Sequence, residues 1–460
     1  MFAGTATQRF DPEYFNRIAL LAQKRLTGSP TLGSTVKEGY RVVYESTDAI
    51  DREEGIKAGL PFFLQSSDIS TPFIDAEAMI CVSNSDWERY PKGRIKPGEL
   101  LIEVKGKAEK IAIVPDDFPA KTLVTGTCFK LTTIDPDLRY FLTAYLTCKY
   151  GQALKDRLKT NLLVSYIAKD DLYGLSIPVA SSDFIKRIKE VFEHCFALQS
   201  TAKKFLDEAN DNLLRALKLE SWQPTTPLSY IRSSTDAFNA GRFDAEYFYP
   251  AKAAAQAHLN ALPGKTVGCM FNSVRELWQP ENAPANQPVR NYDLNDALSP
   301  FLDDAKEPSY PAEIASTKKR IQKGDIVVSR LRSYLKEIAV VQADSKEPLV
   351  GSTEFIVLRP KAGAIPVEAL LVFLRSTLPQ LIFQWSQDGS NHPRFDEKEL
   401  LNLHVPDVVS AISKELTDSV NAATSARQHA KELLEAAKRA VEIAIEDSEA
   451  AALAYLAEFS

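Results

Sequence analysis

The heptapeptide RFDPEYF at residues 9–15 returns as RFDAEYF at residues 242–248, with six of the seven positions identical. Each copy leads into a stretch rich in alanine and leucine, at residues 18–26 and 251–259. A match that continues in order at a fixed distance along a chain indicates an internal duplication. The chain is therefore predicted to contain one kind of domain twice.

Further pairs of segments extend this repeat in the same order, about 230 residues apart. Apolar runs follow Gly98-Glu99 in the first copy and Gly324-Asp325 in the second, which is typical of a turn that enters a buried strand. Short strands alternate with amphipathic helical stretches, so each copy is predicted to be an α+β unit of about 180 residues. The matching segments are residues 65–69 and 290–294, 94–101 and 320–327, 110–114 and 337–341, and 171–178 and 399–406.

A long helix is predicted at the end of each copy. Apolar or small residues keep a 3–4 spacing from Ile185 to Ala216 and again from Val409 to Ala440. Such a spacing over four heptads is typical of a coiled-coil seam. A helix of about 36 residues would be roughly 54 Å long, which is more than one such domain needs as a cover. The alternative is that each helix is amphipathic and lies on its own domain only.

These patterns predict a first domain at residues 1–182 and a first long helix at 183–222. A second domain follows at 223–408, and a second long helix at 409–460. Pro224, Pro227 and a Ser/Thr-rich run mark the linker between the halves. The two heptapeptides themselves are expected to be structural. Their Asp can cap the helix that follows, and their aromatic residues can pack at its start.

The composition is that of a globular protein with two or three domains. Of 460 residues, 45% are hydrophobic and 25% charged. No apolar run reaches the roughly 18 residues that span a bilayer, and no secretion signal is recognisable, so we expect a cytoplasmic protein. The five cysteines and five histidines have no metal-ligand spacing. With a net charge of −6, nucleic-acid binding would require local positive charge.

Several segments of the second copy resemble the target recognition domains in the specificity (S) subunits of type I restriction–modification systems. Residues 324–336 (GDIVVSRLRSYLK), 338–341 and 352–360 are similar to the strand–loop–strand core of those domains, and residues 400–406 to the exit into the family's long helix. The resemblance covers nearly the whole chain. It is weaker in the first copy, where IEVKGK at 102–107 replaces the Ser-Arg-Leu-Arg pattern.

This resemblance implies both a fold and a function. The fold would consist of two homologous α/β domains separated by two long antiparallel coiled-coil helices, which set the spacing between two DNA half-sites. The chain would read a bipartite, asymmetric target in double-stranded DNA without catalysis. It would hold two methyltransferase subunits, which restriction–translocase subunits join, and would not bind a membrane. It would bind no cofactor, since S-adenosylmethionine, ATP and Mg²⁺ belong to the partner subunits. Because the copies have diverged, the half-sites should differ.

Basic and amide side chains are the candidates for DNA contact, because Lys and Arg bind phosphates while Arg, Asn and Gln read base edges. Residues 313–336 carry seven Lys/Arg against two acids, and residues 387–394 form a polar loop. Asp68 and Asp293 are expected to be turn or cap residues. Each stretch could instead be an ordinary solvated surface. The candidates are Lys105, Lys107, Lys110 and Asn161 in the first domain, and Arg290, Asn291, Lys319, Arg320, Arg330, Arg332, Lys336, Asn391, His392 and Arg394 in the second.

Enzymatic motifs are missing from the sequence. It has no Asn-Pro-Pro-Tyr or Asp-Pro-Pro-Tyr tetrapeptide and no Phe-x-Gly-x-Gly loop, with which a methyltransferase would hold S-adenosylmethionine and the target amine. Gly264-Lys265-Thr266 lacks the glycine that a phosphate-binding loop needs five residues earlier, where Leu259 stands. Glu103-Val104-Lys105 is an isolated fragment of a nuclease pattern.

Two other functions stay open at this point. The chain could be the recognition or adaptor subunit of another DNA-modification or phage-defence complex, or a scaffold with a duplicated domain that binds only protein. Steep salt dependence of duplex binding would exclude the protein-only scaffold. A neighbouring gene for a methyltransferase with an Asn-Pro-Pro-Tyr motif would favour the restriction–modification function.

Overall fold

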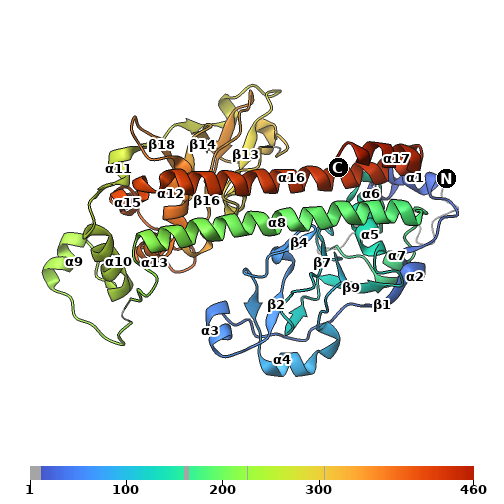
Figure 1. Ribbon diagram of the computed structural model, residues 1–460, viewed down its shortest axis with the longest axis horizontal. Helices are drawn as coiled ribbons and strands as arrows, with labels where there is room; N and C mark the ends of the chain where they lie inside the picture. Colours follow the sequence, from blue (N-terminus) through green and yellow to red (C-terminus); the bar gives the residue numbers. More distant parts are fainter. Residues whose placement is uncertain (1–11, 160–164, 225, 305, 460) are drawn as a thin grey trace. The chain divides into compact units, whose positions relative to one another are not determined.

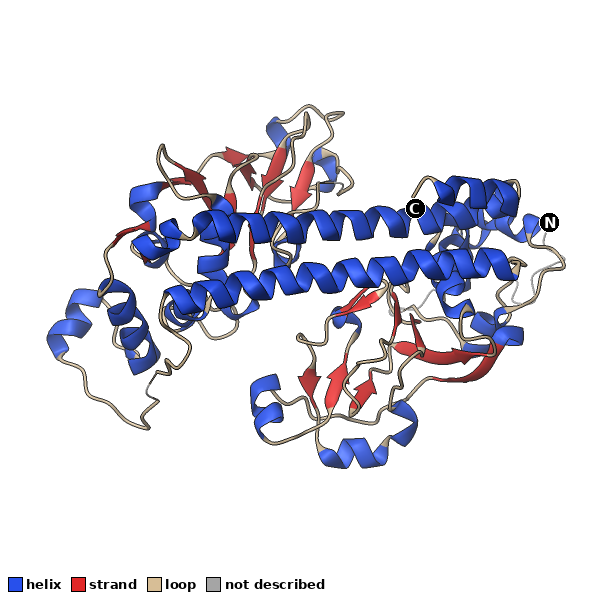
Figure 2. Ribbon diagram, viewed as in Figure 1, coloured by secondary structure: helices blue, strands red, loops and turns tan. Residues whose placement is uncertain are grey.

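The computed structural model describes residues 12–159, 165–224, 226–304 and 306–459. The chain forms two compact units. Unit 1 consists of residues 1–199 and 428–460, and unit 2 of residues 200–427. Each unit combines helices with small β-sheets (Figures 1 and 2), which confirms the predicted α+β class. The finer division into segments 1–182, 183–222, 223–408 and 409–460 remains a prediction.

Unit 1 is built on a four-stranded antiparallel sheet of order β1-β9-β6-β7. A smaller sheet of order β5-β2-β8 lies in the same unit, and its strands β2 and β8 are parallel. Strands β6 and β7 are buried along their whole length. The bounds are β1 Val36–Tyr40, β9 Cys128–Thr133, β6 Leu100–Glu103, β7 Ile111–Ile113, β5 Ile80–Cys81, β2 Phe62–Leu64 and β8 Thr122–Val124. A hairpin joins β3 (Ile69–Ser70) to β4 (Phe73–Ile74).

Unit 2 repeats this arrangement. Its main sheet has the order β11-β18-β15-β16 and the same antiparallel pairings, and its second sheet, β12-β14-β17-β13, again contains one parallel pair, β13 with β17. The bounds are β11 Phe271–Val274, β18 Phe355–Pro360, β15 Ile326–Ser329, β16 Ile338–Val340, β12 Leu277–Trp278, β14 Lys318–Ile321, β17 Leu349–Gly351 and β13 Arg290–Tyr292. A third sheet pairs β10 (Gly264–Thr266) with β19 (His404–Pro406). The duplication inferred from sequence is thus also a duplication of topology.

The parallel strand pairs correct one part of the sequence repeat. Leu64 lies opposite Val124 in unit 1, and Tyr292 lies opposite Gly351 in unit 2. Leu64 therefore corresponds to Tyr292, so that Gln65 matches Asp293 and not Arg290. The alignment of residues 65–69 with 290–294 was wrong by three positions, because strands of three residues carry too little pattern to set a register.

Both copies continue from this strand into a capped turn, as expected for Asp68 and Asp293. The Asp68 carboxylate accepts the Gln65 backbone N–H at 2.8 Å. In unit 2 the Asp296 carboxylate accepts the Asp293 N–H at 2.7 Å, and Asp293 takes the N-cap position of the turn. These acids serve the fold, because they satisfy backbone donors that a turn leaves unpaired.

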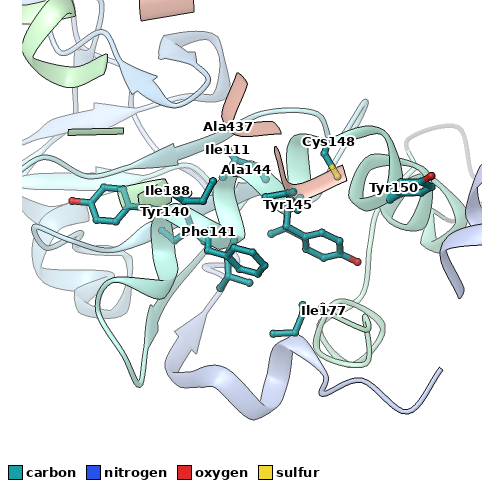
Figure 3. Packing of buried hydrophobic residues seen from close by; sticks show 14 of the residues in the cluster. Ile111, Tyr140, Phe141, Ala144, Tyr145, Cys148, Tyr150, Ile177, Ile188 and Ala437 are labelled. Atoms are coloured by element: carbon teal, nitrogen blue, oxygen red, sulfur yellow. The ribbon is translucent and has the colours of Figure 1, made fainter. Parts of the chain in front are cut away.

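A helix pair follows the main sheet in each unit and fills its core. In unit 1, α5 (Leu138–Thr147) buries Phe141 and Tyr145 against Ile111 of β7, and α6 (Lys149–Leu158) adds Tyr150 to the same cluster (Figure 3). The Tyr145 hydroxyl donates to the Ser176 carbonyl at 2.6 Å, so this large side chain is buried without an unpaired polar atom. The counterparts in unit 2 are α12 (Val367–Arg375) and α13 (Thr377–Gln384).

Two long helices contribute residues to both units. They are α8 (Ser182–Ala216) and α16 (Ser413–Glu446). Within unit 1 they pack antiparallel, since Ser181 N donates to the Glu449 carboxylate at 2.9 Å and Cys195 Sγ approaches the Ala430 carbonyl at 3.5 Å. Within unit 2, one apolar cluster joins Ala209 and Leu213 of α8 to Leu416 and Val420 of α16. The predicted helix pair is confirmed, and helices that each cover only their own domain are not observed.

The second long helix does not continue to the C-terminus as one rod. It ends at Glu446, and a short helix, α17 (Glu449–Ala457), follows in unit 1. The Ser448 hydroxyl accepts the Ala451 N–H at 3.3 Å and caps this new helix. Asp447 and Ser448 therefore interrupt a pattern that was predicted to be continuous to residue 460.

The second heptapeptide has the structural part expected of it. The Asp244 carboxylate accepts the Tyr247 N–H at 2.9 Å and pairs with Arg242 at 2.6 Å. The Tyr247 hydroxyl donates to Glu399 at 3.0 Å. These bonds attach the start of α10 (Pro250–Asn260) to α14 (Glu397–Leu401). In the first heptapeptide, residues 9–11 lie outside the described residues.

Candidate nucleic-acid interface

Two of the predicted DNA-contact segments lie against each other in unit 2. The hairpin loop between β15 and β16, residues 330–337, runs beside residues 387–395, which precede α14. Arg332 N donates to the Pro393 carbonyl at 2.9 Å, and Phe395 N donates to the Arg330 carbonyl at 3.1 Å. We call these two segments the loop pair of unit 2. They share one backbone ladder, so side chains from both can act on one ligand.

Unit 1 contains the same loop pair, formed by residues 104–110 and 165–167. Gly106 N donates to the Ser165 carbonyl at 2.9 Å, and Ile167 N donates to the Val104 carbonyl at 2.8 Å. A bridge between Lys105 and Tyr166 matches the one between Leu331 and Arg394 in unit 2. The backbone hydrogen bonds therefore establish that Val104 corresponds to Arg330, and Tyr166 to Arg394.

A third strand position completes this correspondence. Val104 N donates to the Thr127 carbonyl at 2.8 Å in unit 1, and Arg330 N donates to the Glu354 carbonyl at 3.2 Å in unit 2. Thr127 and Glu354 are thus equivalent. Three equivalent positions carry Val, Thr and Tyr in unit 1 but Arg, Glu and Arg in unit 2. The backbone frame is kept while the side chains on it differ completely.

In unit 2 these three side chains form an ion cluster. The Glu354 carboxylate accepts from Arg330 Nε at 2.9 Å and from Arg394 Nη2 at 2.8 Å. Hydrogen bonds from Arg394, and then from Arg330, hold the pKa of Glu354 below its ordinary value. The side chains of Arg330 and Arg394 remain 43% and 40% exposed. The cluster is therefore a fixed, solvent-accessible group of net positive charge.

The hairpin loop of unit 2 also carries backbone strain. Arg332 and Lys336 have φ of 48° and 53°, in the left-handed region that side chains with a Cβ disfavour. The position of Arg332 is taken in unit 1 by Gly106, with φ of 77°. A non-glycine residue there costs about 1 kcal/mol or more. Strain of this kind gathers at functional sites, where a particular side chain is worth its cost.

Other predicted residues of this loop pair are accessible. The Arg332 guanidinium donates to the Asn391 carbonyl at 3.3 Å and lies 3.3 Å from His392 Nδ1. Asn391, His392 and Lys336 are exposed, as are Tyr334 and Leu335 at the tip of the hairpin. The structure thus brings together six of the predicted candidates, which are Arg330, Arg332, Lys336, Asn391, His392 and Arg394.

Lys319 and Arg320 belong to β14 of the second sheet. Lys319 Nζ donates to the Phe355 carbonyl at 2.6 Å, and burial lowers its pKa. Its acceptor, Phe355, directly follows Glu354 of the ion cluster in the chain. Arg320 is exposed and pairs with Glu276 at 3.0 Å. Whether either contacts DNA remains a prediction.

Arg290 and Asn291 lie on β13, outside the loop pair. Arg290 pairs with Glu347 at 2.7 Å and donates to the carbonyls of Asp304 and Lys306. Asn291 is half-buried, and within the described part of the chain its buried Oδ1 has no hydrogen-bond partner. The guanidinium of Arg290 is engaged within the fold, so its part in DNA reading stays a prediction.

The candidates of unit 1 differ in accessibility. Lys107 is exposed, Lys105 is half-buried, and Lys110 Nζ donates to the Ser66 carbonyl at 2.6 Å. Asn161 lies outside the described residues. Sequence reasoning missed Lys155 of α6, which is fully buried and donates to the Ala108 carbonyl of the loop pair at 2.9 Å. It also missed Glu354, for which the sequence offers no separate signal.

The described residues contain neither a cluster of metal ligands nor a membrane-spanning helix. No group of three or more His, Cys, Asp or Glu side chains among them could hold a metal ion. None of their helices is long and apolar enough to cross a membrane.

Comparisons with known proteins gave matches among solved structures only. No protein-family model matches the chain. No curated protein matches it either. The S subunit of a type I restriction–modification system from M. genitalium aligns over 88% of this chain and 94% of its own, with 16% identity and a TM-score of 0.35. The HsdS subunit from Thermoanaerobacter tengcongensis aligns over 91% and 96%, with 12% identity and a TM-score of 0.27.

A third match has the same coverage, identity and TM-score as the second, and comes from a structure that describes complex assembly and conformational transition of the type I R-M system. All three come from type I restriction–modification systems. At these TM-scores the similarity assigns no function to this chain.

Proposed function

We propose that the chain is a DNA-recognition subunit whose two units each read one half of a bipartite target. The observation that carries this proposal is the loop pair, which recurs with the same backbone hydrogen bonds in both units. A duplicated frame with divergent side chains is what two readers of different base sequences require. This is consistent with the predicted asymmetry of the target.

The chemistry of the loop pairs fits duplex DNA. The pair in unit 2 displays Arg330, Arg332 and Lys336 together with the amide of Asn391. Guanidinium and amide groups bind base edges, and Lys and Arg bind phosphates. The chain as a whole has a net charge of −6, so the positive charge needed for DNA is local.

The rest of the assembly forms part of the same proposal. The chain would be non-catalytic and would hold two methyltransferase subunits, which restriction–translocase subunits join. S-adenosylmethionine, ATP and Mg²⁺ would be bound by those partners. The paired helices α8 and α16 would set the distance between the half-sites. The resemblance to S subunits prompts this part of the proposal. Co-purification of the chain with the proteins that neighbouring genes encode tests it.

Duplex binding as a function of salt tests the proposed function. The chain, purified with any partner subunits it retains, should bind a duplex bearing its target, and raising the salt from about 50 to 200 mM should weaken binding at least tenfold. Arg332→Glu and Lys107→Glu should each weaken binding further. Arg232→Glu, in the exposed segment before α9 (Ser234–Ala240), is the matched control. The absence of salt-dependent, sequence-selective duplex binding would instead support a protein-only scaffold.

A further inference from the structure

We propose that Arg330 reads a guanine in the half-site of unit 2, and that Glu354 and Arg394 are positioning residues for it. This inference rests on the proposed function and names one base and one side chain within it. The ion cluster of unit 2 is the observation that carries it.

The geometry singles out Arg330 among the arginines of the cluster. Its Nε is held by Glu354 at 2.9 Å. Its two terminal nitrogens have no partner among the residues that the structure describes, and the side chain is 43% exposed. Arg394 is different, because its Nε and Nη2 both donate to Glu354 and its Nη1 donates to the His392 carbonyl at 2.9 Å. Arg330 therefore presents a free two-pronged edge, whereas Arg394 is engaged on all three nitrogens.

Because Arg330 is already anchored, its side chain loses less conformational freedom when DNA binds. Glu354 is held from two sides, by two nitrogens of Arg394 and by its own N–H, which donates to Ser352 Oγ at 3.3 Å. A guanidinium fixed at Nε by such a carboxylate loses less rotamer freedom when it meets a ligand. The planar pair of terminal nitrogens matches the two acceptors, O6 and N7, that guanine presents in the major groove. No other base presents two acceptors there.

Unit 1 has none of the three charged side chains of this ion cluster. Val104, Thr127 and Tyr166 occupy the positions of Arg330, Glu354 and Arg394 on the same backbone frame. The first half-site therefore cannot be read by a guanidinium from this place. An effect traced to Arg330 must accordingly stay within one half of the target.

Replacing single guanines by 7-deazaguanine tests the proposal. This base keeps its pairing and O6 but loses N7. The full chain, with any partner subunits it retains, is measured on its mapped target with one guanine replaced at a time. For the wild type, one replacement in one half should weaken binding about tenfold. In Arg330→Met, whose side chain has no donor for O6 or N7, that replacement should have no further effect, while the effects of replacements in the other half remain.

Two further variants separate positioning from contact. Glu354→Gln should lose most of the discrimination between guanine and 7-deazaguanine. It does so although Arg330 itself is retained and although a negative charge that would repel DNA is removed. Arg232→Ala should behave as wild type in this comparison. Unfolding midpoints of all variants are compared first, so that a misfolded variant is recognised.

Each outcome has a distinct meaning. If the wild type does not bind its duplex selectively, the proposed function itself fails. If it binds selectively but no 7-deazaguanine replacement weakens binding, or if Arg330→Met keeps the full discrimination, the assignment of Arg330 is overturned while the proposed function stands. A loss of binding in Arg330→Met that is equal on all sequences would identify Arg330 as a phosphate contact and would also overturn it.

Discussion

Single residues show how far two copies of one frame have diverged. The hairpin loop of each unit has one equivalent residue in the left-handed backbone conformation. In unit 1 this residue is Gly106, which adopts it at no steric cost, whereas in unit 2 it is Arg332. The buried acid at the entry to the main sheet is kept in both units, as Glu99 paired with Lys130 and as Asp325 paired with Arg359. Residues that support the frame are thus similar, and residues that the frame displays are not.

Lys155 is the residue whose ionisation is expected to affect stability. Burial lowers its pKa from 10.5 to about 7, so the folded protein releases this proton at a pH where the unfolded chain still holds it. The group therefore opposes folding below pH 7, and this cost decreases as the pH rises toward 10.5. We predict that Lys155→Met raises the unfolding midpoint at pH 6, by a gain worth a few kcal/mol at most.

This gain should shrink steadily between pH 7 and pH 10 in thermal unfolding experiments. Phe383 takes the equivalent place on α13 in unit 2, which indicates that an apolar side chain fits the frame there. A variant that is less stable than wild type at every pH would mean that the bond from Lys155 to Ala108 outweighs the cost of burying the amine.

At the scale of elements, the long helices were the most predictable part of the chain. Their 3–4 spacing recurs over many turns, so a single misplaced residue does not hide it. Short strands behaved differently: those of three residues carried no usable period, and the register at residues 65–69 was wrong by three. The break at Asp447 and Ser448 also escaped prediction, because Ser is compatible with a helix interior and becomes a cap only in context.

The seam between α8 and α16 in unit 1 is expected to be intolerant of larger side chains. Ala437 and Ala440 are fully buried there, in one cluster with Ile188 and Cys195. We predict that Ala437→Leu destabilises the protein by about 1–3 kcal/mol, because a closely packed seam has no room for three more carbon atoms. Urea denaturation measures this, and Glu432→Leu on the exposed face of α16 is the control. Equal stability of the two variants would show that the seam is loose.

For the molecule as a whole, duplication was predictable from sequence, and the DNA-reading surface only in part. Ordered matches along the chain were sufficient to find two copies of one domain. The pairing of residues 330–337 with 387–395 was not predictable, because it depends on a backbone ladder between segments more than 50 residues apart. Glu354 became recognisable only when that ladder placed it between Arg330 and Arg394.

In the proposed function, two related units read two different half-sites independently. The decisive experiment replaces residues 1–182 with the corresponding domain of a related chain that has another target, and then maps methylated sites across the genome of cells that carry the intact system. One half of the methylated motif is expected to change, while the other half and the overall spacing stay as they were. A motif that changes in both halves, or in neither, would contradict the proposed function.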